Sequence, residues 1–368
     1  MTVGYFSPLP PAPTGVADYS AALLPLLREL GPVETAPPRC DVALYHVGNN
    51  TLHREIYQHA LAQPGIVVLH DGVLQHLFLG MLDAEQYVEE FVYNYGESSR
   101  GLALQLWDQR ARSGADARYF GYAMLKRLAT ASRAVIVHNP AAAALVQQHA
   151  PQTPVVEIPH LFQTPALPAP AATQLFRQRL GIGEQTLLIG TFGHQRETKR
   201  LTVLLRAFHQ AVQTGADLSL LVSGDFVSST FENAVAPLLN HPRILRTAYL
   251  PETDLWRYAA AVDVCVNLRY PSAAETSGIA IRMMGIGKAV IFTAGAALDR
   301  IPEHACLRVA AGPEEEPMLA GYLAWLAGNR DAAAAIGQRA AAHIAQHHDP
   351  KTVARAYWDA LTKYKAAQ

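Results

Sequence analysis

Short apolar segments that alternate with helix-like stretches restrict the fold of this chain more than any other feature. In the first half these segments are residues 3–6, 42–45, 66–69 and 134–137, each bounded by turn residues. Strands that alternate with helices form parallel sheets, because a crossover helix returns the chain to the same edge. The first half therefore predicts a doubly wound α/β unit.

The second half repeats this pattern. Its apolar segments are residues 187–192, 218–223, 244–248, 262–268 and 289–293, each followed by a helix-like stretch. A chain of 368 residues, half of them apolar, is longer than one hydrophobic core usually serves. We therefore expect two doubly wound domains.

A proline-rich stretch separates the two halves. Six prolines lie between residues 151 and 172, and proline stiffens the chain and interrupts helices. We predict an N-terminal domain over residues 1–162, a linker over 163–173 and a second domain over 174–348. A final helix over 349–368 carries an apolar stripe that we expect to pack back on the first domain. The stripe consists of Val353, Tyr357, Leu361 and Tyr364.

Charge and cysteine content exclude several classes of protein. Lysine and arginine total 30 against 31 acidic residues, so no overall field favours a nucleic-acid partner. Three separated cysteines without a CxxC pair fit a reducing compartment. No signal-peptide pattern and no run of eighteen apolar residues occurs. These features predict a cytoplasmic protein, and the sequence sets no oligomeric state.

Two segments of the first half place polar residues after a predicted strand. Gly15 and Asp18 lie between the first strand and a helix expected over residues 21–30, and His70 and Asp71 close the strand at 66–69. Ligands bind at the carboxyl ends of such strands. Glycine lets a ligand approach the backbone, and imidazole can donate to a phosphate or sugar oxygen. The alternative is structural, with Asp18 and Asp71 as helix caps.

A basic segment opens the second domain. His194, Arg196, Lys199 and Arg200 follow the strand at 187–192 and precede a helix expected over residues 201–213. Cations beside the free N–H groups of a helix N-terminus form a phosphate site. An idle solvated face is the alternative, although cations are unfavourable at a helix start.

A second phosphate-binding pattern follows the strand at 262–268. Thr276 or Ser277 can cap the next helix, which would leave the N–H groups around Gly278 and Ile279 facing an anion. Glu275, outside the cap, would be free to accept hydrogen bonds from sugar hydroxyls. The alternative is a capped core helix with an exposed carboxylate. Other polar candidates of this segment are Arg269 and Arg282.

Together these segments resemble family 4 of the retaining glycosyltransferases with the GT-B fold, in which two Rossmann-like domains face a nucleotide-sugar cleft. The glycine-containing first turn of the family matches Gly15, and its first-domain histidine matches His70. Its diphosphate-binding lysine matches Lys199, and the first glutamate of its paired-glutamate motif matches Glu275. The dinucleotide and P-loop glycine patterns are absent. Similar Glu-Thr-Ser-Gly…Arg sequences occur in a bacterial branch associated with polysaccharide assembly, as does the stretch at 46–50.

Two positions depart from the family pattern. His194 stands where the family usually has a diphosphate arginine, for which Arg196 and Arg200 are possible substitutes. Arg282 stands in the slot of the second glutamate, which typically holds the ribose. The resemblance thus identifies the family better than it identifies the donor.

The resemblance implies a retaining transfer from a nucleotide-diphosphate sugar to a saccharide, a lipid-linked or another hydroxyl acceptor. Lys199, Arg196 and the backbone at 277–279 would neutralise the leaving diphosphate. His70 would bridge the sugar and the diphosphate, and Glu275 would orient the sugar. Neither a cofactor nor a metal is expected.

Two other functions and two local features stay open. A sugar-nucleotide epimerase would share the fold and nucleotide site, and a degenerate transferase would only bind a glycan or a partner transferase. Residues 100–133 combine seven basic residues with apolar ones and are a candidate for peripheral membrane contact. The group of His343, His347 and His348 suggests a metal, but we expect a solvated helix face.

Overall fold

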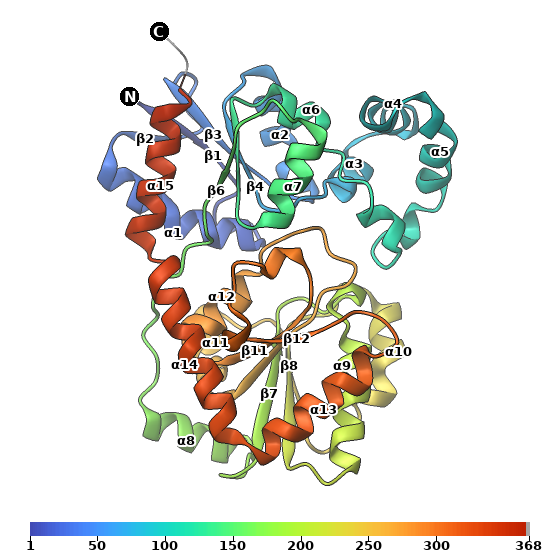
Figure 1. Cartoon of the computed structure of the whole chain (residues 1–368), viewed down its shortest axis with the longest axis vertical. Coiled ribbons are helices and arrows are strands. Elements are labelled where there is room, and N and C mark those ends of the chain that lie inside the picture. Colours follow the sequence, from blue (N-terminus) through green and yellow to red (C-terminus); the bar gives the residue numbers. More distant parts are fainter. Residues whose placement is uncertain (366–368) are drawn as a thin grey trace.

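The computed structural model describes residues 1–365 and consists of two α/β domains stacked along the long axis of the molecule (Figure 1). Each domain contains a six-stranded sheet in which all paired strands are parallel. The two doubly wound units expected from the sequence are therefore confirmed.

The first sheet has the strand order β2-β1-β3-β4-β5-β6. Side chains alternate between two apolar cores, as the two-residue period of a strand requires. One face is covered by α1 and α15, and the other by α2, α6 and α7. The strands are β1 (Val3–Phe6), β2 (Val33–Thr35), β3 (Val42–Val47), β4 (Ile66–Leu69), β5 (Ala134–Val137) and β6 (Val155–Glu157). The helices are α1 (Gly15–Leu30), α2 (Arg54–Ala62), α3 (Gln75–Met81), α4 (Ala84–Tyr95), α5 (Arg100–Asp108), α6 (Lys126–Ala131) and α7 (Pro140–His149).

The second sheet has the order β12-β11-β10-β7-β8-β9. Helices α9, α10 and α13 cover one face, and α11, α12 and α14 cover the other. The strands are β7 (Leu187–Phe192), β8 (Leu218–Ser223), β9 (Ile244–Thr247), β10 (Val264–Asn267), β11 (Ala289–Thr293) and β12 (Leu307–Val309). The helices are α8 (Pro170–Arg179), α9 (Leu201–Gln213), α10 (Ser229–Leu239), α11 (Glu252–Ala261), α12 (Gly278–Gly285), α13 (Glu315–Gly328) and α14 (Arg330–His347).

Part of the proline-rich stretch is a strand. β6 pairs with β5 at the edge of the first sheet, and Pro154 accepts a hydrogen bond from the N–H of Val135 at 2.9 Å. Proline is tolerated there because an edge strand needs ladder hydrogen bonds on one side only. Helix α8 begins at Pro170, inside the segment 163–173 expected to be linker, since proline suits the first turn of a helix.

The first helix begins earlier than expected. α1 starts at Gly15 instead of residue 21, because the hydroxyl of Thr14 accepts the N–H of Val16 and caps it. Asp18 therefore lies within α1 and is not its cap. At the other end of α1, the ring of Trp358 from α15 packs against Gly31.

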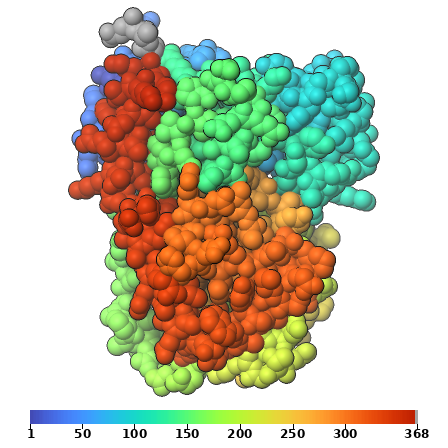
Figure 2. Space-filling view, in the orientation of Figure 1, coloured from blue at the N-terminus to red at the C-terminus, as the bar shows by residue number. Residues whose placement is uncertain are grey.

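The chain passes between the domains twice, and the two crossings are joined. The first crossing follows β6, and the second lies between α14 and α15 (Pro350–Lys363). The N–H of Phe162 donates to the carbonyl of His348 at 2.9 Å, and the ring of His348 bonds to the carbonyl of His160. Figure 2 shows the red C-terminal helix lying along the side of the first domain. The apolar side chains of α15, such as Tyr357, are buried there.

Candidate functional site

Helix α12 begins at Gly278, directly after a capping serine. Ser277 caps the helix, with its Oγ 3.4 Å from the N–H of Ala280, and Arg269 donates to the same oxygen at 3.1 Å. The N–H groups of Gly278 and Ile279 have no carbonyl one turn earlier to bond, because the helix begins there. Together with the helix dipole they favour a negative group. Of the two caps offered by the sequence, the structure uses Ser277.

The Glu275 carboxylate is held by its own loop. Its oxygens accept hydrogen bonds from Arg269 at 3.0 Å, from the hydroxyl of Ser272 at 2.9 Å and from the N–H of Ala273 at 2.8 Å. Burial would raise the pKa of Glu275, but Arg269 and the hydrogen bonds outweigh it and lower the pKa. These three bonds occupy most of the roughly four acceptor positions of a carboxylate. The expectation of a free carboxylate is therefore wrong, and Glu275 is ionised and fixed in orientation.

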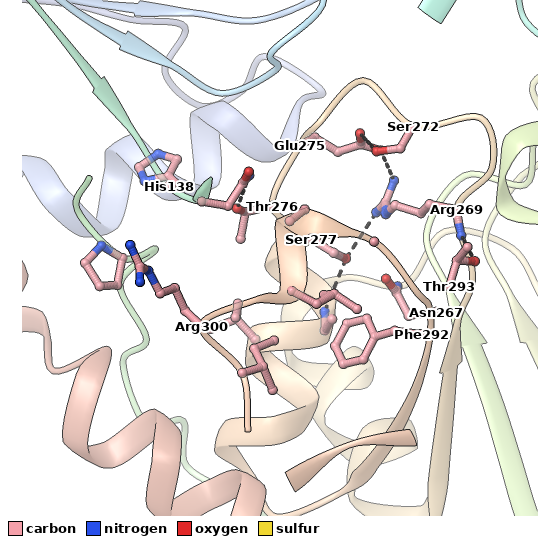
Figure 3. Close-up of a pocket in the computed structure, with 18 of the residues that line it drawn as sticks. His138, Asn267, Arg269, Ser272, Glu275, Thr276, Ser277, Phe292, Thr293 and Arg300 are labelled. Atoms are coloured by element: carbon pink, nitrogen blue, oxygen red, sulfur yellow. Dashed lines mark hydrogen bonds and ion pairs between the residues drawn. The ribbon is translucent and has the colours of Figure 1, made fainter. Parts of the chain in front are cut away.

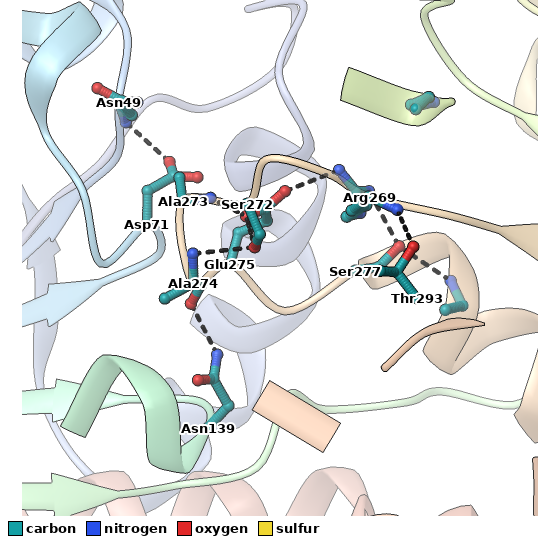
Figure 4. A network of polar contacts seen from close by, with 12 residues as sticks. Asn49, Asp71, Asn139, Arg269, Ser272, Ala273, Ala274, Glu275, Ser277 and Thr293 are labelled. Carbon is teal, nitrogen blue, oxygen red and sulfur yellow. Dashed lines mark hydrogen bonds and ion pairs between the residues drawn. The ribbon is translucent and has the colours of Figure 1, made fainter. Parts of the chain in front are cut away.

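The loop between β10 and α12 contacts the first domain directly (Figure 4). The amide nitrogen of Asn139, after β5, donates to the carbonyl of Ala274 at 2.9 Å and to the hydroxyl of Thr276 at 3.0 Å. Gly72, after β4, packs so closely that a Cβ there would lie 2.9 Å from the Cβ of Ala274. Thr276 therefore has an interdomain role and does not cap the helix.

Asp71 lies at the end of β4 and near Glu275 of the other domain. It is not a helix cap, because α3 begins only at Gln75, and its Oδ2 instead accepts the N–H of Asn49 at 2.8 Å. Burial and the negative charge of Glu275 raise the pKa of Asp71 to about 6, although Asn49, Arg196 and Arg269 oppose the change. Two carboxylates of different domains thus meet where a cleft is expected.

Lys199 faces the end of β7. Its ammonium donates to the carbonyl of Phe192 at 2.6 Å. Desolvation, followed by the positive charges of Arg269 and Arg196, lowers the pKa of Lys199 well below its usual value. A negative ligand would relieve this repulsion. Lys199 is therefore the basic side chain best placed to gain from binding a diphosphate.

The other basic residues of this segment differ in whether their side chains are free to bind a ligand. Arg200 has a left-handed backbone (φ 58°), and its guanidinium pairs with Glu315 of α13, so a diphosphate would have to compete with that carboxylate for it. His194 and Arg196 are exposed. Arg196 lies close enough to Glu275 and Asp71 to affect both pKa values. Arg196 therefore remains available as a second diphosphate cation.

Sequence reasoning missed the residue that shapes this loop. Gln195 is fully buried, and its amide donates to the carbonyls of Gly193 and Ser223 at 2.8 and 3.1 Å. Gly224 has a φ of 120°, and a Cβ there would lie 2.6 Å from the carbonyl oxygen of Gly193. Only glycine allows this approach. The sequence did not indicate this role for Gln195, because one of its partners, Ser223, lies at the end of the neighbouring strand β8.

His70 belongs to a cluster of packed aromatic rings, of which His46 is stacked on it. Its Nε2 lies 2.9 Å from Nδ1 of His46, and the ring lies 5.2 Å from Tyr19 and 5.1 Å from His138. Burial, followed by the neighbouring histidines, lowers the pKa of His70 well below its usual value. The ring is neutral, so it can offer a hydrogen bond to a ligand without adding charge.

Asp18 of α1 lies close to Arg282 of α12 in the second domain. Nothing would contact a Cβ at Gly15, so that position opens to solvent. Burial raises the pKa of Asp18, opposed by the positive charge of Arg282 across the domain boundary. The guanidinium of Arg282 also lies 5.8 Å from the ring centre of Trp256. Arg282 therefore faces α1 and α11.

A cavity of about 460 Å³ lies on the β11 side of the 268–277 loop (Figure 3). Both domains line it. The first domain contributes His138, Asn139, Glu157 and Pro159, and the second contributes the ends of β10 and β11, the first turn of α12 and the end of α14. Glu275 and Ser277 line this cavity as well, whereas Lys199, Arg196 and Arg282 do not.

The histidines near residue 345 do not form a solvated face, so that expectation is wrong. His343 and His348 are 9% and 7% exposed and line the cavity together with His347. His347 is exposed, whereas His348 is buried where the end of α14 packs against the interdomain crossing at His160. Within residues 1–365, no group of three or more His, Cys, Asp or Glu side chains is placed to hold a metal ion.

Three of the seven basic residues of 100–133 pair with acidic neighbours. Arg100 pairs with Glu89 and Glu97, Arg118 with Asp116, and Arg127 with Glu90. This segment is part of a lobe that projects sideways from the first domain (Figure 1). No helix in the described part of the chain is both long and apolar enough to span a bilayer.

Comparisons with known proteins identify the architecture. No family model matches the chain, and no curated protein matches its sequence. One similar solved structure is HepE of Anabaena in complex with UDP-glucose, with a TM-score of 0.64 and 15% identity over 99% of this chain and 100% of that chain. A second is WaaG, a glycosyltransferase involved in lipopolysaccharide biosynthesis, with a TM-score of 0.62 and 16% identity over 98% of this chain and 99% of that chain. A third is sucrose-phosphate synthase of Thermosynechococcus elongatus, with a TM-score of 0.68 and 16% identity over 99% of both chains. The protein therefore has the GT-B fold, the two-domain α/β architecture of these glycosyltransferases.

Proposed function

We propose that the protein transfers a sugar from a nucleotide-diphosphate sugar to a hydroxyl acceptor with retention of configuration. The observation that carries the proposal is the position of Arg269, which donates to the Ser277 cap of α12 at 3.1 Å and whose charge, with that of Arg196, helps to lower the pKa of Lys199. A diphosphate bound there gains the helix dipole and two positive charges at the point where negative charge develops on leaving.

The other side chains have consistent roles. Glu275 is ionised and fixed, so its remaining acceptor capacity orients donor hydroxyls. His70 is neutral and donates between the sugar and the diphosphate. The leaving diphosphate accepts the proton of the attacking hydroxyl, so no dedicated base is required. Gly15, Asp18 and Arg282 border the nucleotide, and the reaction uses no metal.

Uridine diphosphate is the donor nucleotide that we propose first. HepE of Anabaena has been crystallised with UDP and with UDP-glucose. The sequence motifs support membership of family 4 and a role in polysaccharide assembly on the cytoplasmic side. Residues 163–169 are proposed as the linker, and α15 (Pro350–Lys363) as the C-terminal helix that joins the second domain to the first; residues 366–368 of the expected segment 349–368 lie outside the described part of the chain.

Calorimetric titration with UDP, GDP, ADP and dTDP tests nucleotide binding directly. We expect UDP to bind and Lys199→Ala to weaken it. Incubation with UDP-glucose and a saccharide panel then separates the alternatives. A new glycoside whose anomeric proton shows the donor configuration supports retaining transfer, whereas conversion of free UDP-glucose to an epimer contradicts it. Nucleotide binding without any turnover would identify a degenerate, binding-only protein.

A further inference from the structure

The stretch at 46–50 contacts both candidate residues that follow β4, His70 and Asp71. His46 of β3 is fully buried, and its Nδ1 lies 2.9 Å from Nε2 of His70. The N–H of Asn49 donates to the carboxylate of Asp71 at 2.8 Å (Figure 4). The side-chain oxygen of Asn49 also accepts the N–H of His76, at 2.8 Å. This stretch is therefore placed to set the orientation of both candidate side chains.

The contact between His46 and His70 contains a single proton. Burial, followed by the neighbouring histidines, lowers the pKa of both rings well below the usual value. Both rings are therefore neutral, and each has one N–H and one lone pair. Either Nδ1 of His46 or Nε2 of His70 donates, and this choice decides which nitrogen of His70 carries its proton.

Two neighbouring histidines show which tautomer the surroundings favour. Nδ1 of His53 lies 2.9 Å from the carbonyl of His46, and Nδ1 of His138 lies 2.9 Å from the carbonyl of Ile158. Burial lowers the pKa of His53 and of His138 to about 4, so both rings are neutral. Since a carbonyl only accepts, both Nδ1 atoms carry the proton, and Nε2 of each ring is a lone pair.

The Nε2 atom of His46 has the same surroundings. Like Nε2 of His53 and of His138, it is enclosed and has no partner within residues 1–365. A buried N–H without an acceptor is rarer in proteins than a buried acceptor without a donor. The enclosed Nε2 of His46 is therefore a lone pair, and its proton is on Nδ1.

The proton on His46 determines the state of His70. Nδ1–H of His46 donates to Nε2 of His70, so the one proton of the His70 ring is on Nδ1. His70 is only partly buried, which leaves its Nδ1–H for a ligand. An N–H donor is what a sugar hydroxyl or a phosphate oxygen can accept.

We propose that His46 is a positioning residue that holds His70 in the Nδ1–H tautomer, with this N–H directed to an oxygen of the donor substrate. The assignment rests on the proposed transferase function and adds which ring nitrogen of His70 meets the substrate. His46 is fully buried and acts through His70 alone.

Long-range proton–nitrogen NMR of the histidine-labelled protein at pH 7.5 identifies the tautomer, because protonated and bare ring nitrogens differ in chemical shift. His70→Gln lacks the ring and assigns its signals. We expect wild-type His70 to carry its proton on Nδ1. His46→Phe keeps an aromatic ring beside Tyr5, 4.7 Å away, but has no donor, so His70 should populate both tautomers. A proton on Nε2 in wild type, or unchanged His70 signals in His46→Phe, would overturn the proposal.

Steady-state kinetics with UDP-glucose test whether the tautomer matters to the reaction. His46→Phe should lower kcat/KM about ten- to hundredfold, the loss typical of removing the partner that orients a functional histidine. In a His70→Gln background the same change should have no further effect, because His46 acts through His70.

Gln75→Met is a matched control. It removes another hydrogen bond of a fully buried side chain in the first domain, from the hydroxyl of Tyr87 to Oε1 of Gln75 at 3.0 Å. This variant should leave the His70 tautomer and kcat/KM unchanged. Additive losses from His46→Phe and His70→Gln would make the role of His46 structural and overturn the proposal.

The wild-type spectrum requires neither a variant nor turnover, so it decides the tautomer even if His46→Phe does not fold. An Nε2–H tautomer together with intact UDP binding would leave the proposed transferase function standing. Failure of the wild-type protein to bind any of the four nucleotides would contradict that function separately.

Discussion

At the scale of single residues, the candidate site brings together like-charged side chains that have few partners of opposite charge. Lys199 shares its surroundings with Arg269 and Arg196, and its one hydrogen-bond partner is a neutral carbonyl. Asp71 lies near Glu275 with a single N–H partner from Asn49. Each charge is less stable here than in water, and a charged ligand of opposite sign would restore the balance for the lysine.

Lys199→Ala should lower kcat/KM with UDP-glucose by about 10²–10³-fold, because one charge-stabilising donor is lost. Arg243→Ala is a matched control, since Arg243 precedes the edge strand β9 of the same sheet and its guanidinium pairs with Asp217. Steady-state kinetics of both variants decide the point. Equal activity of Lys199→Ala and the control would remove Lys199 from the reaction.

Asp71→Asn should change how stability depends on pH. The pKa of Asp71 is raised to about 6 in the folded protein, so protonated Asp71 is favoured there, and its contribution to stability is lost as pH rises from about 4 through 6. The pKa difference corresponds to at most about 3 kcal/mol of unfolding free energy.

Asparagine keeps an oxygen for the N–H of Asn49 but carries no charge. Urea unfolding of both proteins at pH 4 and pH 7.5 measures the effect. We expect the unfolding free energy of the variant, relative to that of wild type, to be higher at pH 7.5 than at pH 4. Parallel pH profiles would show that Asp71 does not titrate in this range.

At the scale of elements, α12 combines a structural and a functional end. Ser277→Ala should cost about 1 kcal/mol of stability through loss of the cap and should also weaken UDP binding, because the first turn presents the N–H groups. Asp83→Ala removes the cap of α4 in the projecting lobe, where Asp83 bonds the N–H of Gln86 at 2.9 Å. That control variant should lose a similar amount of stability without any change in UDP affinity. Thermal unfolding combined with UDP titration separates the two effects.

Prediction from sequence succeeded where neighbours in the chain determine the structure. The strands at 187–192 and 218–223 have the observed bounds, and the Ser277 cap follows from local pattern. It failed where distant residues meet. Asn139 bonds a loop 135 positions later, and His348, just after α14, is buried against the interdomain crossing at His160. Glu275 is occupied because the loop folds back on Arg269, which periodicity does not encode.

At the scale of the whole molecule, Asn139 joins the domains through one side-chain amide. Asn139→Asp retains the cap of α7, since its Oδ1 still accepts the N–H of Ala142, but loses the donor to Ala274 and Thr276. We expect faster hydrogen exchange in residues 272–279 and a higher KM for UDP-glucose, with stability little changed. Asn139→Ser, which also caps but is neutral, tests whether the added charge alone is responsible. Unchanged exchange in both variants would contradict the role of this contact.

The paired crossings at Phe162 and His348 have a mechanical consequence. Because the two connections between the domains are hydrogen-bonded to each other, they define one hinge axis at one side of the molecule. Rotation about that axis moves Asn139 away from Ala274 and separates Asp71 from Glu275, while residues at the axis hardly move. We therefore expect any relative rotation of the domains to be centred near His348 and to change the spacing of the Asp71 and Glu275 carboxylates most.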